Sequence, residues 1–303
     1  MKLFAPSYYQ KFKCIADRCQ NSCCIGWEID VDEGTYGRYA KSEDPYAKNI
    51  LRSIEAGEEG TKHFRLASGE RCPHLDARGL CRIISQMGEA YLCEICREHP
   101  RFYHDTKSGK EVGLGMACEE ACRLILTEDY RTFVPIGECE GEPYRGAFDA
   151  TKERAALYAI LSDRALPYTE RLRAISEAYG VSLAIHTDEE WRAILQSLEY
   201  LNPSNKDRFA RFSSAFTHPQ KAERALERAL AYFVFRHASA AESPDEFRAR
   251  LGFCLFCERL LASLVSQAPE EDVAALARVL SEELEYSEEN TVALIEDFYF
   301  SLP

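Results

Sequence analysis

The sequence predicts a mainly α-helical fold, with a cysteine-rich region of loops and short helices over residues 1–145 and a bundle-like helical domain over residues 146–303. Two shifts in composition predict this division. Eleven of the 13 cysteines lie before residue 140, in a region where turn-forming Gly and Asp are also frequent. Beyond residue 145 the chain is rich in Ala, Leu, Glu and Arg, and its apolar residues recur at helical spacing.

The first region is expected to contain little sheet and to be organised around a metal. Cys19, Cys23 and Cys24 form a C-x3-C-C group, and on a helical turn the first two side chains share one face. A proline and a glycine bracket residues 72–81, so this loop is expected to fold back as a hairpin-like knuckle.

Helices are predicted mainly in the second region. The clearest covers residues 221–238, where Ala222, Leu226, Ala229 and Phe233 follow the spacing of one buried helix face. Further helices are predicted over residues 149–163, 167–180, 187–201, 204–216, 243–267, 270–285 and 287–301.

Start signals mark several of these helices. Thr187 and Ser243 each stand three residues before a glutamate, as in a capping box. A short helix is also predicted over residues 119–126 of the first region. It places Cys118 at a helix N-terminus, where free N–H groups favour the thiolate.

The cysteines of the first region are spaced like metal ligands. Thiolates held together by turns bind soft metal ions or iron–sulfur clusters, because sulfur is a soft, polarizable donor. The spacing matches neither the paired C-x2-C groups of a zinc ribbon nor the C-x3-C-x2-C pattern of radical enzymes that use S-adenosylmethionine. A four-iron cluster with a second site and a pair of zinc sites are both compatible with the residues.

Five other cysteines are less typical of ligands. Cys93 and Cys122 lie within one helical turn of better candidates, and Cys139 lies in a loop. Cys254 and Cys257 form a C-x2-C pair inside an apolar helical run, where buried core thiols are expected.

Composition disfavours several classes of function. The net charge of −13 disfavours nucleic acid as a partner, because an acidic surface repels phosphates. No apolar run approaches the roughly 20 residues that cross a bilayer, and the first residues show no signal-peptide pattern. We therefore expect a cytoplasmic protein with no membrane partner, whose cysteines stay reduced rather than forming disulfides.

Several stretches together carry a family resemblance. They are residues 6–9 (PSYY), 12–19 (FKCIADRC), 23–27 (CCIGW), 35–36 (TY) with Tyr39, 71–75 (RCPHL), 80–82 (LCR), 88–92 (GEAYL), 96–101 (CREHPR), 116–121 (MACEEA) and 232–237 (YFVFRH). In these residues the chain resembles the flagellin lysine-N-methylase family of bacteria, most densely over residues 6–126. The C-x3-C-C group is also similar to that of broader zinc- or iron-chelating cysteine domains.

The resemblance implies a set of metal ligands and an activity. The family pattern has cysteine at the positions of Cys14, Cys19, Cys23, Cys24, Cys72, Cys81, Cys96 and Cys118, which are therefore the candidate ligands. It implies transfer of a methyl group from S-adenosylmethionine to the ε-amine of lysines in a protein acceptor such as flagellin. It also implies an iron–sulfur centre, expected as a 4Fe–4S cluster, with zinc as the alternative.

The methyl-donor pocket and the catalytic base are not assigned by the sequence. No glycine-rich strand-to-helix loop of the usual methyltransferase type is visible, since Gly113 and Gly115 lack a third glycine and a clear preceding strand. The tyrosines and histidines near the cysteines are each more typical of packing. The alternative function is a non-enzymatic zinc- or iron–sulfur-binding module fused to a helical interaction domain.

Overall fold

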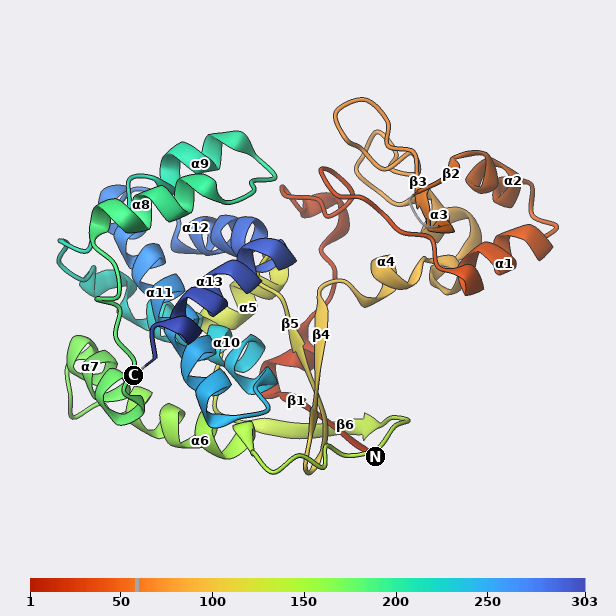
Figure 1. The fold of residues 1–303 in the computed structure, drawn as a ribbon. Helices are drawn as coiled ribbons and strands as arrows, with labels where there is room; N and C mark the ends of the chain where they lie inside the picture. Colours follow the sequence, from red (N-terminus) through yellow and green to blue (C-terminus); the bar gives the residue numbers. More distant parts are fainter. Residues whose placement is uncertain (58–59, 303) are drawn as a thin grey trace. The chain divides into compact units, whose positions relative to one another are not determined.

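The computed structural model describes residues 1–57 and 60–302, and it confirms a mainly α-helical chain (Figure 1). The chain divides into two compact units. Unit 1 comprises Met1–Phe12 and the chain from Arg101 onward, and unit 2 comprises Lys13–Pro100. Within the described ranges, no helix combines the length and the apolar character that crossing a bilayer requires.

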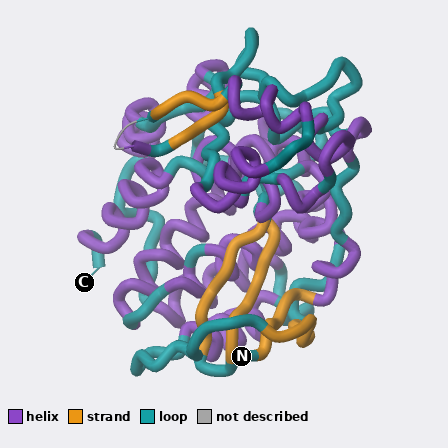
Figure 2. Tube along the Cα trace, turned by 90° about the vertical axis from the view of Figure 1, so that its right-hand side faces the viewer, coloured by secondary structure: helices purple, strands orange, loops and turns teal. Residues whose placement is uncertain are grey.

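Unit 1 contains a four-stranded sheet of order β4-β5-β1-β6, which the sequence did not predict. Its strands are β1 (Lys2–Pro6), β4 (Arg101–Thr106), β5 (Gly109–Leu114) and β6 (Phe133–Glu138). The antiparallel strands β4 and β5 form the long hairpin seen in Figure 2, while β1 runs parallel to β5 and antiparallel to β6. Because β1 pairs with strands from residues 109–138, the compact units divide at residues 12/13 and 100/101 rather than at residue 145.

The helices of unit 1 follow most of the predicted ranges. They are α5 (Glu119–Thr127), α6 (Ala150–Leu161), α7 (Tyr168–Tyr179), α8 (Asp188–Ser197), α9 (Pro203–Phe209), α10 (Glu223–Arg236), α11 (Pro244–Gln267), α12 (Val273–Leu280) and α13 (Glu288–Phe300). The capping box at Thr187 is confirmed, and the Ser243 hydroxyl accepts from the N–H of Glu246. The helix predicted over 204–216 ends at Phe209 instead, since the backbone beyond it bonds to other segments: Phe212 O accepts from Arg192.

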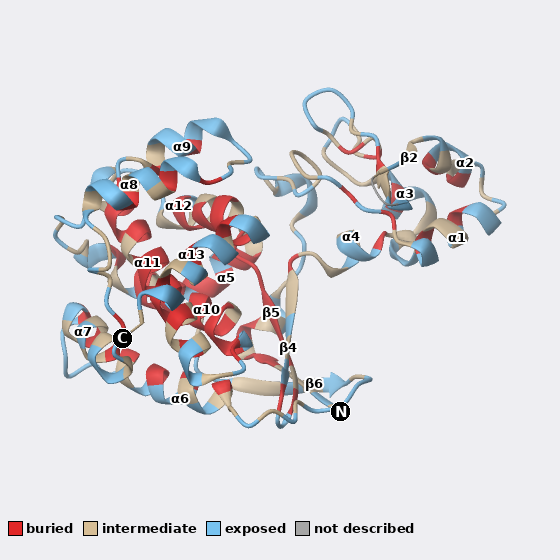
Figure 3. Cartoon of the chain, in the orientation of Figure 1, coloured by how far each residue is buried: buried red, intermediate tan, exposed pale blue. Residues whose placement is uncertain are grey.

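Helix α11 forms the centre of the core of unit 1 (Figure 3). Phe253, Phe256 and Leu260 on this helix are 0% exposed, and Trp191 from α8 stacks on Phe256 with ring centroids 4.1 Å apart. Cys254 and Cys257 are also fully buried here, as predicted. A helix buried on most of its surface leaves little room for unsatisfied polar side chains.

Unit 2 is built from short elements. They are α1 (Glu33–Lys41), α2 (Pro45–Arg52), β2 (Ile54–Ala56), β3 (Lys62–Phe64), α3 (Arg82–Met87) and α4 (Glu94–Glu98). Its buried apolar residues include Ile29, Tyr39, Ile50 and Phe64. Residues 19–24 form bends and a turn rather than the helical turn considered from the spacing of the cysteines.

Replacing Phe256 by Ala is expected to lower the free energy of unfolding of unit 1 by about 3–5 kcal/mol, because it leaves a cavity beneath Trp191. Phe300→Ala is the matched control, since Phe300 is 82% exposed and its loss leaves no cavity. Denaturant unfolding of both variants, followed by circular dichroism, measures the difference. Equal losses of stability would contradict the position of α11 at the centre of the core.

Candidate functional site

Five cysteines of unit 2 lie together in its apolar core and form what we call the thiol cluster. They are Cys24, Cys72, Cys81, Cys93 and Cys96. Cys72 and Cys93 are buried, and the other three are half-buried. The thiols also act on one another electrostatically, which confirms that they lie close together. Four of the five belong to the predicted ligand set, whereas Cys93 does not.

The knuckle predicted over residues 72–81 is confirmed and positions two of these thiols. Leu75 and Cys81 face each other as an antiparallel bridge. The N–H of Cys72 donates to the carbonyl oxygen of Cys24 at 2.8 Å, which ties the knuckle to the segment that carries the C-x3-C-C group. A backbone hydrogen bond therefore holds Cys24 next to Cys72, although the two residues are far apart in the sequence.

Backbone N–H groups point at the sulfurs of this knuckle. Burial raises the pKa of Cys72 to about 12, and the hydrogen bond from the backbone of His74 opposes that rise. Burial likewise raises the pKa of Cys81, whose sulfur receives opposing backbone hydrogen bonds from Ile84 and Ile83. Such donors stabilise the thiolate over the thiol, and the thiolate is the form that binds a metal.

Cys93 and Cys96 form a hydrogen-bonded pair at the start of α4, where Cys93 is the N-cap residue. Their mutual hydrogen bond lowers the pKa of Cys93 and raises the pKa of Cys96. The hydroxyl of Tyr39 lies 3.7 Å from the sulfur of Cys93 and donates to the carbonyl oxygen of Tyr91 at 2.5 Å. Cys93 is thus as closely integrated into the cluster as the predicted ligands are; its C-x2-C spacing to Cys96 was the signal in the sequence.

The other predicted ligands of unit 2 precede the cluster in the chain. Cys14 and Cys23 are exposed, and the half-buried Cys19 donates from its sulfur to the carbonyl oxygen of Asn21 at 3.3 Å. Cys23 connects this segment to the cluster, because its hydrogen bond lowers the pKa of Cys24 to about 7. A low thiol pKa favours the thiolate form of Cys24.

The donor chemistry of the thiol cluster fits a thiolate-bound metal. Five sulfurs surrounded by apolar side chains, two of them facing backbone N–H groups, suit zinc or the iron of an iron–sulfur cluster. In the part of the chain that the structure describes, however, no three His, Cys, Asp or Glu side chains are arranged closely enough to hold one metal ion. The side chains of the thiol cluster would need to turn before three of their sulfurs could bind the same metal ion.

Cys118, the eighth predicted ligand, belongs to unit 1. It is the N-cap residue of α5, so the predicted position at a helix N-terminus is confirmed. Cys122 is buried in the core on the same helix, and Cys139 donates from its sulfur to the carbonyl oxygen of Met1 at 3.7 Å. The five cysteines of the thiol cluster are not joined in disulfides.

His74, one of the side chains considered near the cysteines, is held in a structural role. Its ring nitrogens lie 3.0 Å from the hydroxyl of Tyr46 and 2.9 Å from the hydroxyl of Ser53. Burial lowers its pKa to about 4, so the ring is neutral near pH 7. With both nitrogens engaged, it fixes the knuckle against α2 instead of exchanging protons with a substrate.

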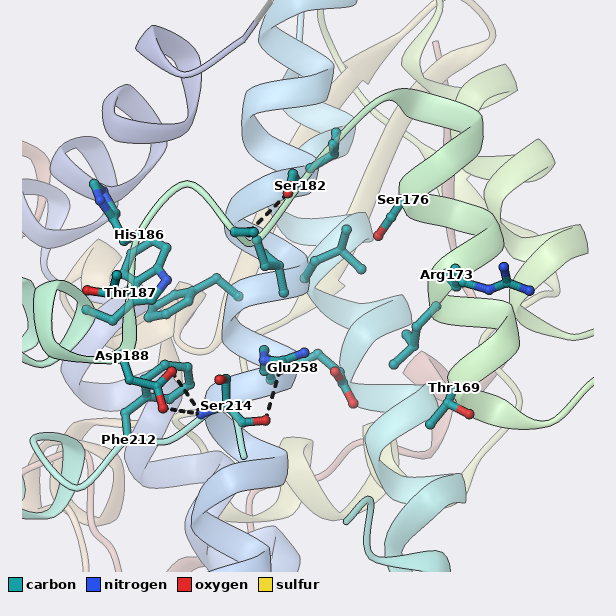
Figure 4. A pocket seen from close by; sticks show the side chains of 18 of the residues that line it. Thr169, Arg173, Ser176, Ser182, His186, Thr187, Asp188, Phe212, Ser214 and Glu258 are labelled. Atoms are coloured by element: carbon teal, nitrogen blue, oxygen red, sulfur yellow. Dashed lines mark hydrogen bonds between the residues drawn. The ribbon is translucent and has the colours of Figure 1, made fainter. Parts of the chain in front are cut away.

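Unit 1 contains a cavity of about 520 Å³ between α7, α11 and the loops that flank α8, which we call the Glu258 cavity (Figure 4). Its apolar walls include Leu172, Val181, Leu183, Trp191 and Phe212. Polar side chains from α7 line one side of the opening, and those of residues 186–188 lie opposite (Figure 4). The volume is in the range of pockets that take small ligands.

Glu258 of α11 is the buried carboxyl group of this cavity. Its residue is 2% exposed, and one of its oxygens accepts a hydrogen bond from the hydroxyl of Tyr168 at 3.0 Å. Burial raises the pKa of Glu258 from 4.5 to about 8. Nothing in the sequence around Glu258 indicated this, because the residue lies in an ordinary apolar helical run.

Replacing Glu258 by Gln should make the protein relatively more stable as the pH rises from about 5 to 8. The folded protein keeps the carboxyl proton up to the raised pKa while the unfolded chain releases it near 4.5, so native stability declines over this range by up to roughly 5 kcal/mol. The Gln variant has no carboxyl group to titrate, so its stability should not decline in this way. The thermal midpoints of both proteins, measured across pH 5–8.5, test this prediction, and the exposed Glu177→Gln is the control. Parallel curves for E258Q and the natural protein would contradict the raised pKa.

Part of the chain is similar in sequence to known proteins of Salmonella. The lysine-N-methylase of Salmonella typhimurium is 30% identical over 128 residues, which are 41% of this chain and 32% of that protein. The flagellar biosynthetic protein FliU of Salmonella muenchen is 30% identical over the same length, which is 76% of FliU. No family model and no solved structure matches the chain.

The match is local in the longer relative, since the chain spans about a third of the length of the lysine-N-methylase. It covers most of FliU, however, and a second lysine-N-methylase, from Salmonella choleraesuis, matches to the same extent. The chain therefore belongs to the flagellin lysine-N-methylase family.

Proposed function

We propose that the protein is a protein-lysine N-methyltransferase that transfers methyl groups from S-adenosylmethionine to lysines of a protein acceptor such as flagellin. The observation that carries this proposal is the identity to two lysine-N-methylases and to a flagellar biosynthetic protein. The name of FliU supports a flagellar acceptor. The net charge of −13 favours an acceptor surface that carries lysines.

The reaction sets the requirements for the site. The lone pair of a neutral lysine amine attacks the sulfonium methyl group, a new N–C bond forms, and the S–C electron pair returns to sulfur as a thioether. Free lysine has a pKa of about 10.4, so its ammonium must lose a proton before the attack. The protein must therefore exclude water around the amine and offer a group that accepts the proton.

We further propose that the cysteines of unit 2, namely the thiol cluster with the flanking Cys14, Cys19 and Cys23, supply ligands to an iron–sulfur centre, with zinc as the alternative. The gathering of the cluster's thiols in one core and the N–H groups aimed at Cys72 and Cys81 support this. When bound, such a centre cross-links unit 2, and an iron–sulfur cluster would also add a redox-active group.

Incubation of the full chain, purified without oxygen, with S-adenosylmethionine and flagellin is expected to add methyl groups to acceptor lysines. Intact-mass and peptide mass spectrometry measure the transfer. Flagellin whose lysines have been dimethylated chemically is the matched control, because it offers no primary amine. Absence of transfer together with absence of saturable S-adenosylmethionine binding would overturn the enzyme proposal and favour a non-enzymatic metal-binding module.

Cys72→Ser and Cys93→Ser are each expected to lose most of the bound metal and to lower the thermal midpoint, because metal binding contributes folding energy. Cys139→Ser is the matched control, a half-buried thiol of unit 1 outside the thiol cluster. Iron, zinc and acid-labile sulfide per chain are measured for each protein. Iron with an equal amount of sulfide identifies a cluster, and zinc without sulfide identifies the alternative. Full metal content in Cys93→Ser would remove Cys93 from the ligands.

A further inference from the structure

Among the described residues, the strongly buried carboxyl groups of Glu258 and Glu283 in unit 1 have no cationic partner. Glu283 accepts from the N–H groups of Leu201 and Asn202 and from the Asn205 side chain, whereas Glu258 accepts a single hydrogen bond. The carboxylate of Glu111 is paired with Arg154 at 2.7 Å. That of Glu227 is paired with Arg171 at 2.7 Å, and that of Glu285 lies 3.5 Å from the guanidinium of Arg236. A buried carboxylate is costly unless a charged or hydrogen-bonding partner compensates it.

Glu258 has one hydrogen bond within the described residues, from the hydroxyl of Tyr168 to Oε1. Its second oxygen, Oε2, has no hydrogen-bond partner in the described part of the chain. The neighbouring Arg259 directs its guanidinium away, donating to the carbonyl oxygen of Ser214 at 3.0 Å. The carboxyl group borders the cavity, where solvent or a ligand can donate to this oxygen.

A second polar atom of the same cavity also lacks a partner among the described residues. His218 lines the cavity, and its Nδ1 is buried without a hydrogen bond. Its ring packs against that of Tyr168, which donates to Glu258, with the two ring centroids 5.4 Å apart. The cavity therefore presents two polar atoms, Oε2 of Glu258 and Nδ1 of His218, that a polar ligand can engage.

The apolar residues that line the cavity indicate which groups of the ligand lie next to its polar end. Leu172, Val181 and Leu183 suit methylene groups, and Trp191 and Phe212 add aromatic surface that attracts cations. The ligand that combines a cationic donor with an apolar stem is an alkylammonium. A sulfonium is also cationic, but it has no N–H to satisfy Oε2, so a primary ammonium fits better.

We infer that the Glu258 cavity binds a lysine side chain, with the ammonium donating to Glu258 and the methylenes against the apolar walls. This rests on the proposed function only in naming that side chain as the acceptor lysine. Near neutral pH the buried carboxyl group holds a proton, which it releases to solvent as the ammonium binds. The carboxylate then takes a proton from the ammonium, which becomes a neutral amine as the carboxylate becomes a carboxylic acid. Tyr168, His218 and Arg259 are the other titratable groups beside it and tune that transfer.

Isothermal titration of the full chain, with its metal, against N-acetyl-lysine methylamide tests the assignment. E258Q is expected to weaken binding by about ten- to a hundredfold, since it removes a charged hydrogen-bond partner. E177Q, an exposed change on α7 outside the cavity, should bind like the natural protein. Leu172→Trp, which fills the cavity, should also weaken binding. N-acetyl-norleucine methylamide, which lacks the amine, should bind weakly to every variant.

Equal affinity of E258Q and the natural protein for the lysine probe would overturn the assignment. It would also be overturned if the natural protein bound the norleucine probe as tightly as the lysine probe. Binding of S-adenosylmethionine that depends on Glu258, without binding of the lysine probe, would overturn it in favour of a sulfonium site. Binding does not depend on turnover, so the two proposals fail separately. Glu258-dependent amine binding without methyl transfer counts against the proposed function alone, and methyl transfer with amine binding unchanged in E258Q counts against the lysine site alone.

Discussion

The pairing of β1 with β5 and β6 is the constraint on which the organisation of the whole chain depends. It takes the first residues into unit 1, so residues 13–100 form an insertion that leaves the chain after β1 and returns at β4. An inserted unit must be stabilised by its own core and its own cross-links. Unit 2 has a small apolar core in which cysteines occupy central positions, so a bound metal would serve its stability as well as any chemistry.

The two units carry different kinds of functional groups. Unit 2 gathers soft sulfur donors, with backbone N–H groups that favour the thiolate at Cys72 and Cys81. Unit 1 gathers oxygen and aromatic groups around a cavity, with one carboxyl group that lacks a cationic partner. The proposed methyl transfer requires a dry site for an amine, and the cavity of unit 1 supplies apolar walls around a carboxyl group for this purpose.

The helices and the local cysteine geometry could be predicted from sequence because local patterns encode them. The capping box at Thr187, the N-cap position of Cys118 and the buried Cys254 and Cys257 all follow from residues within one or two helical turns. The sheet could not be predicted, because β1 pairs with segments a hundred residues away and its short strands carry little periodicity.

Two features of the candidate sites were missed for related reasons. Cys93 lies within one turn of Cys96 and was set aside, yet its N-cap position brings both sulfurs into hydrogen-bonding contact. Glu258 lies in an apolar helical run of the sequence, and only its tertiary surroundings, including the hydrogen bond from Tyr168 of α7, show that its carboxyl group is buried beside a cavity. Burial is a property of tertiary contacts, which periodicity within a single helix does not reveal.

The insertion also fixes the order in which the protein can be assembled during synthesis. β1 is synthesised before its partners, which end at residues 114 and 138, so it stays unpaired while the whole of unit 2 emerges. The thiols of unit 2 can therefore meet on a nascent chain in which β1 is still an open edge. The proposed metal, once bound at that stage, would cover the reactive sulfurs before the sheet of unit 1 closes.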